Sequence, residues 1–239
     1  MAFHFNFRTF IEIFLYAVQY LPVTLILAYV PSIIDFVFGT WLAFGEYCGH
    51  KGCKFLRNFM TLFSKCMPML LLLFLGYFIT YNFLAWLRQN YNFPIGPKDM
   101  DPIWVAIFVL SMDGIGYFAQ TMKGALNSIG KDQLEAGYSI GLTTKQTFLR
   151  IVLPQIIIEA FPNLKINVRT RIMLSALVFT IAIIDVMNAA TSYAENTASF
   201  IEAYLVCAVI YWGICTGTSK LLSLIEKRIA IKTGVLSRI

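Results

Sequence analysis

The sequence has 239 residues, of which 58% are hydrophobic and only 13% carry charged side chains. Ordinary soluble domains carry about 25% charged residues, so this composition excludes a typical soluble protein and indicates a membrane protein. The formal net charge is +6, but the Lys and Arg residues lie between apolar runs and form no single basic stripe, which argues against nucleic acid as a partner. We interpret residues 1–239 as one integral membrane domain.

Five apolar runs are candidates for transmembrane helices, which need about 20 residues to cross a bilayer. Helices are expected because a helix pairs its own backbone N–H and C=O groups, and an unpaired group in hydrocarbon is costly. The runs are too long and too uniformly apolar for the alternating strands of a membrane barrel. The predicted spans are residues 15–44, 67–87, 103–121, 172–186 and 200–222. The predicted fold class is an all-α integral membrane protein with five transmembrane helices, preceded by an amphipathic lead-in.

The distribution of basic residues predicts the orientation of these spans. Sixteen of the 19 Lys and Arg residues lie between the first and second spans, between the third and fourth, or at the end of the fifth and beyond. Only Arg8, Arg88 and Lys98 lie on the other side. Because loops rich in Lys and Arg stay in the cytoplasm, we expect the N-terminus outside, the C-terminus inside, and residues 123–167 on the cytoplasmic side.

Three residues of metal-binding type lie close together in CGHKGC, namely Cys48, His50 and Cys53. A structural zinc site needs four ligands, and we find no fourth. The total of five Cys is odd, and two of them fall inside an apolar run, so a disulfide framework is not expected either. We predict no metal site and leave the role of the three residues open.

The segment 123–167 is too long for a simple connection and has the signals of short helices. Asp132 followed three residues later by Glu135 is typical of a helix cap with a returning carboxylate. Gly141 then breaks the run, as glycine does just past a helix end. The first short helix is therefore expected to end at Gly141.

A second short helix is predicted to follow. Thr143 and Gln146 have the spacing of a capping box. This helix is expected to run through Arg150 and to end by Leu153, because Pro154 disfavours helix at the residue before it. Two short helices joined by a glycine hinge would make a rigid element that protrudes from the membrane. It could lie on the lipid headgroups, or it could dock into a cytoplasmic partner.

This segment carries a seven-position pattern that resembles the cytoplasmic signature of permease subunits of bacterial ABC importers. That signature reads Glu-Ala-Ala, three residues, Gly, nine residues, Ile, one residue, Leu-Pro. The positions of this sequence at the same spacing are Glu135, Ala136, Gly137, Gly141, Ile151, Leu153 and Pro154. Only Gly137 departs, because it replaces the second Ala, and it is expected to loosen the first short helix.

The likeness narrows to the polar-amino-acid permeases of the histidine, arginine and glutamine type. It is strongest over residues 116–162, and it extends to the segment around Pro68 and to the five-span layout. The resemblance implies a permease for polar amino acids in a bacterial inner membrane. It also implies a second permease subunit, identical or paralogous, and an extracytoplasmic substrate-binding protein. Cytoplasmic ATP-binding subunits would carry ATP and magnesium, and this chain would need no cofactor of its own.

In proteins of that family the loop docks in a cleft of the ATP-hydrolysing subunit, whose closure on ATP moves the permease helices. A rigid helical element would transmit such a push, so Gly141 would set the angle between the two arms. Glu135 would either face basic groups of the ATPase or brace the loop internally. The sequence leaves these two roles of Glu135 open.

An enzymatic role finds no support in the motifs of this chain. The run GALNSIGKD resembles a phosphate-binding loop, but it has five residues between its glycines and places Asp132 where Ser or Thr should meet magnesium. His4 and His50 are predicted on opposite sides of the membrane, so they cannot share a site. We therefore expect a transport subunit, with ATP hydrolysis in a separate chain.

Polar residues inside the apolar spans are candidate substrate-contacting positions, because a central charge costs about 2.5–3.5 kcal/mol on insertion scales and usually faces a cavity. Asp113 lies near the middle of the third span, where related permeases usually have a neutral Asn. Its carboxylate could meet a cationic or amino group of the substrate. It could equally pair with Arg169 or Arg171, or with the partner permease.

The fourth span gives a weaker assignment. Met173 and Ser175 fall in the segment where the family often has a Lys-Asp or His-Ser pair, so a second permease could supply the main contacts or the substrate could differ. Lys65, before Pro68, is expected to extend its amine to the membrane surface from the start of the second span. Asp185 is expected to brace an outer gate or to meet a substrate-delivery protein.

Three other functions remain open at this point. A membrane channel or scaffold would have no ATPase partner. An integral membrane enzyme would need a polar catalytic cluster, which we cannot assemble from these residues. An ABC permease could also carry a small solute other than an amino acid, and the sequence leaves open which solute it carries and whether the permease pair is a homodimer or a heterodimer.

Overall fold

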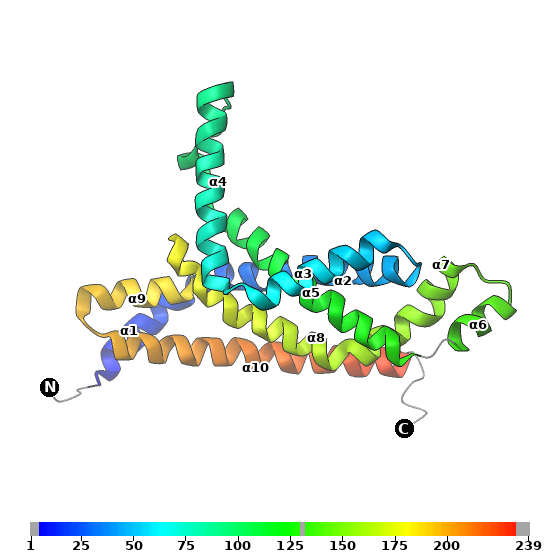
Figure 1. Ribbon diagram of the computed structural model, residues 1–239. Helices are drawn as coiled ribbons and strands as arrows, with labels where there is room; N and C mark the ends of the chain where they lie inside the picture. The colour runs from blue at the N-terminus through cyan, green and yellow to red at the C-terminus, as the bar shows by residue number, and fades with distance from the viewer. Residues whose placement is uncertain (1–4, 130–131, 233–239) are drawn as a thin grey trace. The chain divides into compact units, whose positions relative to one another are not determined.

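The computed structural model describes residues 5–129 and 132–232 (Figure 1). Over these ranges the chain is helical almost throughout and contains no strand. The α-helices are α1 Phe7–Val18, α2 Leu21–Tyr47, α3 Lys51–Cys66, α4 Met69–Tyr91, α5 Pro102–Ser128, α6 Asp132–Ser139, α7 Thr144–Thr147, α8 Leu153–Ser175, α9 Val186–Thr197 and α10 Phe200–Lys232. A π-helical turn, η2, covers Phe148–Val152, and the 3-10 helices η1 and η3 cover Pro97–Asp99 and Ala176–Ile181.

Five helical segments of the described chain are long and apolar enough to cross a membrane. They are Leu21–Tyr47, Met69–Tyr91, Pro102–Ser128, Thr144–Ile181 and Phe200–Ile231. The predicted all-α fold class with five membrane-crossing helices is confirmed. The orientation of these helices in the membrane stays a prediction.

The first predicted span, 15–44, has the wrong boundaries because it joins parts of two helices. α1 ends at Val18 and α2 begins at Leu21. α1 corresponds to the expected lead-in, and the Asn6 side chain caps it by accepting hydrogen bonds from the backbone N–H groups of Arg8 and Thr9.

The fourth predicted span, 172–186, begins too late. The helical segment already starts at residue 144, and α8 alone covers Leu153–Ser175. Residue 172 is therefore near the end of α8, and the helix gives way to η3. Charged residues made the first part of α8 resemble a loop; they are Glu159, Lys165, Arg169 and Arg171.

The chain divides into two compact units, each made of three separate stretches. Unit 1 contains Met1–Pro31, Met67–Ser111 and Thr170–Thr216. Unit 2 contains Ser32–Cys66, Met112–Arg169 and Gly217–Ile239.

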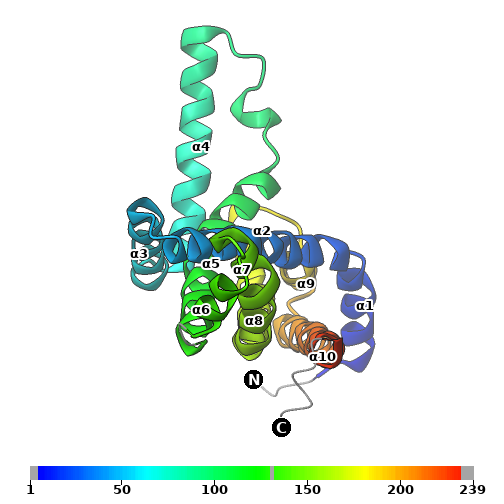
Figure 2. The same ribbon diagram turned by 90° about the vertical axis from the view of Figure 1, so that its right-hand side faces the viewer.

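Unit 1 has a core of small side chains where α1, α9 and the first part of α10 meet. Ala190 and Ala194 on α9 and Ala203 on α10 are fully buried, together with Ile13 on α1. α1 lies beside α9 (Figure 1 and Figure 2). Small residues let helices approach closely, as is typical of packing in membranes.

Unit 2 has a core of larger side chains contributed by α2, α5, η2 and α8. Phe118, Phe148 and Ile156 are almost completely buried in it. The ring centroids of Phe44 and Phe148 lie 4.4 Å apart, a separation typical of favourable aromatic pairs. This core therefore fixes η2 against α2 and α5.

α3 is tied to α5 within unit 2. The Ser64 hydroxyl donates to the backbone carbonyl of Asp113 at 2.6 Å, and the Tyr117 hydroxyl donates to the carbonyl of Ser64 at 3.3 Å. Gly116 permits this approach, because a Cβ there would lie 2.6 Å from the carbonyl oxygen of Met60. The C-terminal end of α3 therefore has a fixed position on α5.

Candidate functional site

The helices α6 and α7 form a hairpin in unit 2 (Figure 1). Gly141 has a φ of +78°, and its backbone N–H donates to the carbonyl of Tyr138 at 2.9 Å. The N–H of Leu142 donates to the carbonyl of Gly137 at 3.1 Å. These two bonds form a Schellman motif. The left-handed backbone of Gly141 would cost a residue other than glycine roughly 1–2 kcal/mol. The predicted helix break at Gly141 is confirmed.

The second arm of the hairpin begins with the predicted capping box. Thr143 Oγ1 accepts from the N–H of Gln146 at 3.3 Å, and the Gln146 side chain accepts from the N–H of Thr143 at 3.0 Å. The hydroxyls of Tyr138 and Thr144 lie 3.3 Å apart and link the two arms. The predicted cap of the first arm rests on Asp132, whose side chain lies outside the described residues.

The expected helix end before Pro154 is wrong. α7 continues through η2 into α8 without a break, so Pro154 lies inside one helical segment. In an α-helix the proline ring clashes with the carbonyl four residues earlier, which is that of Arg150. Arg150 lies in the π-helical turn, where hydrogen bonds span five residues, and this wider turn accommodates the ring.

Glu135 and Ala136 are exposed on α6. The carboxylate of Glu135 forms no ion pair within residues 5–129 and 132–232. Its backbone carbonyl accepts from the Ser139 hydroxyl at 2.8 Å. Among the described residues no contact therefore supports an internal bracing role for the Glu135 carboxylate.

Gly137 is buried where the first arm packs against the second. A Cβ at this position would overlap the Thr147 side chain and lie 2.7 Å from its Oγ1. Thr147 is itself fully buried. Glycine lowers the helix propensity of α6 by about 1 kcal/mol relative to Ala, but it also lets the two arms of the hairpin meet.

Ile151, Leu153 and Pro154 form the base of the hairpin. All three are half-buried, and Leu153 packs against the unit 2 core. The carbonyl of Ile151 accepts from the side-chain amide of Gln155 at 2.9 Å. These residues join the hairpin to α8, whereas Glu135 and Ala136 face outward.

The three candidate pathway residues belong to different units. Asp113 on α5 belongs to unit 2 and is 4% exposed. Met173 and Ser175 on α8 belong to unit 1. Met173 is 62% exposed, whereas Ser175 is fully buried and donates its hydroxyl to the carbonyl of Ile172 at 2.8 Å. Met173 and Ser175 therefore do not line one surface together.

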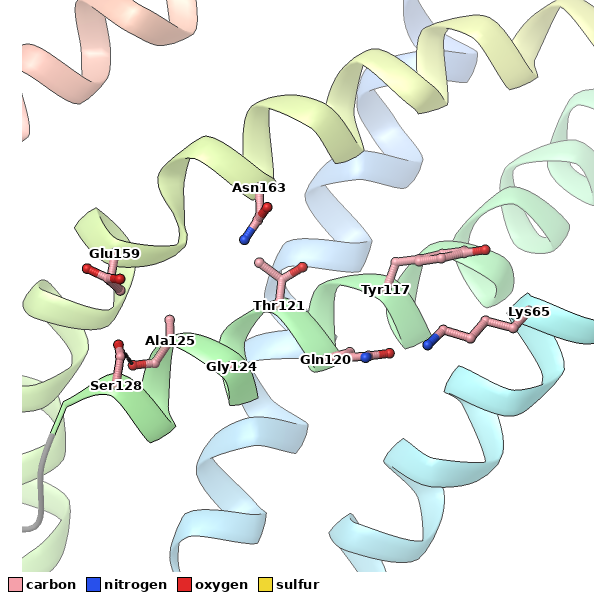
Figure 3. Close-up of a pocket in the computed structure, with 9 residues that line it drawn as sticks. All are labelled: Lys65, Tyr117, Gln120, Thr121, Gly124, Ala125, Ser128, Glu159 and Asn163. Atoms are coloured by element: carbon pink, nitrogen blue, oxygen red, sulfur yellow. Dashed lines mark hydrogen bonds between the residues drawn. The ribbon is translucent and has the colours of Figure 1, made fainter.

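A polar pocket of about 430 Å³ lies within unit 2 (Figure 3). Its lining includes Lys65, Tyr117, Gln120, Thr121, Glu159 and Asn163. Figure 3 shows the Lys65 amine beside Gln120 at one end of the pocket, whereas Glu159 lies beside Ala125 and Ser128 at the other end.

Sequence reasoning missed this pocket because three separate segments build it. The available signal was that Tyr117, Gln120, Gly124 and Ser128 recur at helical spacings of three or four along α5, three of them with polar side chains and two of them beyond the predicted end of the third span. The side of the pocket formed by Glu159 and Asn163 of α8 could not be recognised, because the sequence analysis interpreted the first part of α8 as a loop.

Asp185 is a buried acid in unit 1. Its carboxylate accepts from the N–H of Asn188 at 2.9 Å, which caps α9, and from the Tyr211 hydroxyl at 3.0 Å. The N–H of Val186 donates to Thr24 Oγ1 at 3.2 Å. Burial raises the pKa of the Asp185 carboxyl. Because Asp185 is fully buried, it braces the bend between η3 and α9 and is not presented to a delivery protein.

The residues of the CGHKGC run are spread between packed and exposed positions. Cys48 and Cys53 are half-buried and His50 is exposed. Among the described residues no group of three or more His, Cys, Asp or Glu could hold a metal ion. Cys53 instead packs on Gly45, where a Cβ would overlap its Sγ.

Comparisons with known proteins agree with one another. Residues 35–231 match the family described as binding-protein-dependent transport system inner membrane component. The chain is 28% identical over 210 residues to the L-cystine transport system permease protein TcyL of Bacillus subtilis. That match covers 88% of this chain and 85% of TcyL. The chain is also 30% identical over 210 residues to the probable amino-acid permease protein YxeN of Bacillus subtilis, and that match covers 88% of this chain and 89% of YxeN.

The fold also resembles that of a solved transporter. A chain in the crystal structure of an amino acid ABC transporter with histidines has a TM-score of 0.76 and 23% identity to this chain. The match covers 95% of this chain and 100% of that one.

Proposed function

The chain belongs to the family of binding-protein-dependent transport system inner membrane components, and from this premise we propose that it is the permease subunit of an ATP-driven importer of polar amino acids. The family consists of transport subunits and not of catalytic ones. Relatives named as amino-acid permeases support the substrate class. The α6–α7 hairpin would receive the movement of an ATPase.

The observation that carries this proposal is the construction of the hairpin. Its two arms are joined by a glycine in a left-handed conformation, held by two backbone bonds, and closed by a capping box. Glu135 and Ala136 are exposed on the first arm, while Gly137 is buried against Thr147. The result is a stiff surface element with one acidic group directed outward.

The connection of the hairpin to α8 supports a mechanical role. α7, η2 and α8 form one continuous helical segment, and Phe148 and Val152 of η2 are buried in the unit 2 core. A displacement of the hairpin therefore acts on a helix that is long and apolar enough to cross the membrane. A flexible loop at this position would absorb the same displacement without moving the helix.

The partners follow from this mechanism. Two cytoplasmic ATP-binding subunits would hold ATP and magnesium, one against the hairpin of each permease. A second permease, identical or paralogous, would complete the pathway, and an extracytoplasmic binding protein would deliver the substrate. We place the complex in a bacterial inner membrane, with the hairpin on the cytoplasmic side.

The test compares Gly141→Pro and Glu135→Lys with the wild type, using the full chain purified with its accompanying subunits and reconstituted in liposomes. Proline requires a φ near −65°, so it cannot adopt the +78° of Gly141. We expect amino-acid uptake to fall at least tenfold in both variants, while ATP hydrolysis continues and membrane insertion is unchanged.

Asn127→Lys is the matched control, because it adds a positive charge to an exposed position of α5 outside the hairpin. Its uptake should stay within about twofold of the wild type, as is usual for surface substitutions. Unchanged uptake in Glu135→Lys and Gly141→Pro would contradict the coupling role. A wild-type chain that purifies without any ATP-binding subunit would favour a channel or scaffold.

A further inference from the structure

We propose that Glu46, at the C-terminal end of α2, is a positioning residue through which the movement of the α6–α7 hairpin reaches α3 and α5. In this scheme Phe44 and Tyr47 of α2 receive the movement from the hairpin, and Glu46 passes it on. The inference rests on the proposed transport function and deepens it, because it names the residues that would carry the movement beyond α8.

The base of the hairpin contacts α2 through one aromatic side chain. Phe148 is the first residue of η2 and directly follows α7. Its ring centroid lies 4.4 Å from that of Phe44 and 5.2 Å from that of Tyr47, separations typical of favourable aromatic pairs. Phe44 and Tyr47 are three residues apart, so they share one face of α2. A displacement of the hairpin therefore acts on α2 through two ring contacts at once.

Glu46 joins α2 to two further helices. Its Oε2 accepts from Nε of Arg57 on α3 at 2.6 Å, and its Oε1 lies 3.1 Å from Nζ of Lys123 on α5. Successive residues of an α-helix point about 100° apart. Glu46 can therefore face α3 and α5 while the neighbouring Tyr47 faces the hairpin.

The burial of Glu46 makes this bridge hard to separate. The Glu46 side chain is only 10% exposed, and salt and water screen partly buried pairs much less than exposed ones. Moving Glu46 away from Arg57 or Lys123 would leave a poorly hydrated charge without its partner, which is strongly unfavourable. We therefore expect α3 and α5 to follow the end of α2 when it moves.

α3 is also held to α5 at a second point. The Ser64 hydroxyl donates to the carbonyl of Asp113 at 2.6 Å, and the Tyr117 hydroxyl donates to the carbonyl of Ser64 at 3.3 Å. Arg57 and Ser64 are two helical turns apart on α3. With one tie at each of these residues, α3 is expected to move together with α2 and α5.

The bridge gives the hairpin a second connection to the membrane helices besides its continuity with α8. Asn167 of α8 donates its side-chain amide to Thr121 Oγ1 of α5 at 3.2 Å, and Glu46 extends the connection to α3. The pocket of unit 2 is lined by residues of α3, α5 and α8. Without the Glu46 bridge, α8 would still be displaced by the hairpin, but α3 and α5 would follow it less closely.

The test measures uptake of a radiolabelled mixture of amino acids per ATP hydrolysed. It uses the full chain purified with its accompanying subunits and the delivery protein, reconstituted in liposomes. For Glu46→Gln we expect this ratio to fall about fivefold or more, the usual range for coupling between sites, while ATP hydrolysis stays within about twofold of the wild type. A purely structural role would reduce the amount of folded complex, so uptake and ATP hydrolysis would fall together and their ratio would stay constant.

Glu226→Gln is the matched control, because it breaks the Lys165–Glu226 ion pair, which joins α8 to α10 at 2.7 Å. Its ratio should stay within about twofold of the wild type. An equal fall in Glu226→Gln and Glu46→Gln would overturn the proposal, and so would an unchanged ratio in Glu46→Gln. If Glu46→Gln fails to assemble, Lys123→Gln replaces it: a lowered ratio would support the proposal, and an unchanged one would overturn it.

The contact between α2 and the hairpin has its own test. Tyr47→Ala removes the ring that packs on Phe148, and we expect it to lower the ratio in the same direction as Glu46→Gln. Tyr47→Phe keeps the ring and removes only a hydroxyl that has no hydrogen-bond partner among the described residues, so its ratio should stay within about twofold of the wild type. Equal ratios in the two variants would reject the ring contact as the point of entry.

The outcomes separate this proposal from the proposed function. ATP-driven uptake that Glu135→Lys and Gly141→Pro abolish, but that Glu46→Gln leaves intact, would reject the role of Glu46 alone. A wild type without ATP-driven uptake of any amino acid would reject both.

Discussion

The α6–α7 hairpin and the η3–α9 segment both reverse the chain between long helices, but they are built differently. The hairpin is closed by bonds among residues 137–146, with Gly141 in the left-handed conformation. In the η3–α9 segment, Ala182 follows η3 and Ala198 follows α9, with φ of +62° and +54°. Thr24 and Tyr211 from distant helices hold the bend between them. One reversal is defined by its own sequence and the other by its surroundings.

This difference shows how each segment responds to force. The exposed arm of the hairpin can be pushed while its internal bonds stay intact, because those bonds are local. The η3–α9 segment cannot move without breaking buried contacts to α2 and α10. A coupling role suits the first construction, and a bracing role suits the second.

The largest expected effect comes from removing the buried acid of the η3–α9 segment. Asp185→Ala would leave the Tyr211 hydroxyl and the N–H of Asn188 without their acceptor. Unsatisfied buried donors cost about 1–3 kcal/mol each, so we expect a loss of about 3 kcal/mol in the free energy of unfolding. Thermal unfolding of the purified protein in detergent measures this loss, and a loss below about 1 kcal/mol would contradict the bracing role.

Asp185→Asn is the matched control, because it keeps an acceptor and cannot titrate. Burial raises the folded-state pKa of Asp185 above its ordinary value of 3.8. The protonated acid therefore contributes stability that is fully present below pH 3.8 and is lost as the pH rises through the raised folded value. As the pH rises from 3.8 to the raised folded-state pKa, the wild type should lose stability relative to Asp185→Asn. A difference in stability that stays constant over this range would count against the effect of burial.

A smaller effect is expected where the two arms of the hairpin touch. Gly137→Ala would force the new methyl group against Thr147, and overpacking of this kind costs about 1–3 kcal/mol. Thr147→Ala removes the opposing atoms and a buried hydroxyl that has no hydrogen-bond partner among the described residues. We expect the double variant Gly137→Ala/Thr147→Ala to be more stable than Gly137→Ala alone by about 1 kcal/mol or more. A double-mutant cycle of unfolding free energies measures this coupling between the two positions. Additive effects would show that the two arms do not meet at these residues.

The smallest effects concern the turn residues themselves. Gly141→Ala should destabilise the hairpin by about 1–2 kcal/mol because alanine resists the left-handed conformation. Ala182→Gly should change stability in the opposite direction by a few tenths of a kcal/mol, since relief of the same strain is partly offset by the greater freedom of glycine when unfolded. The unfolding midpoints of Gly141→Ala and Ala182→Gly, each compared with that of the wild type, measure these effects. If both midpoints shifted in the same direction, the two reversals would not differ in the way described.

The sequence predicted the features that depend on neighbouring residues. Gly141, Thr143 and Gln146 specify the hairpin through local hydrogen bonds, and the long apolar runs specify five membrane-crossing helices. The start of α8 was missed because Glu159 and Lys165 resemble a loop until their positions are known: Glu159 lines a pocket, and Lys165 pairs with Glu226.

Two further features could not be predicted because they depend on tertiary geometry. Pro154 has the usual signal of a helix end, and only the π-helical turn before it explains why the helix continues. The pocket needs α3, α5 and α8 side by side, and no local pattern in any one of them shows that Lys65 and Glu159 share a cavity.

The extra residue in η2 also sets the rotational phase between the hairpin and the pocket. An α-helix turns about 100° per residue, from about 3.6 residues per turn. Deleting one residue from Phe148–Val152 would thus swing Glu159 and Asn163 about a quarter of a turn around the α8 axis relative to α7. The five-residue turn determines which side of α8 faces the cavity when the hairpin is driven.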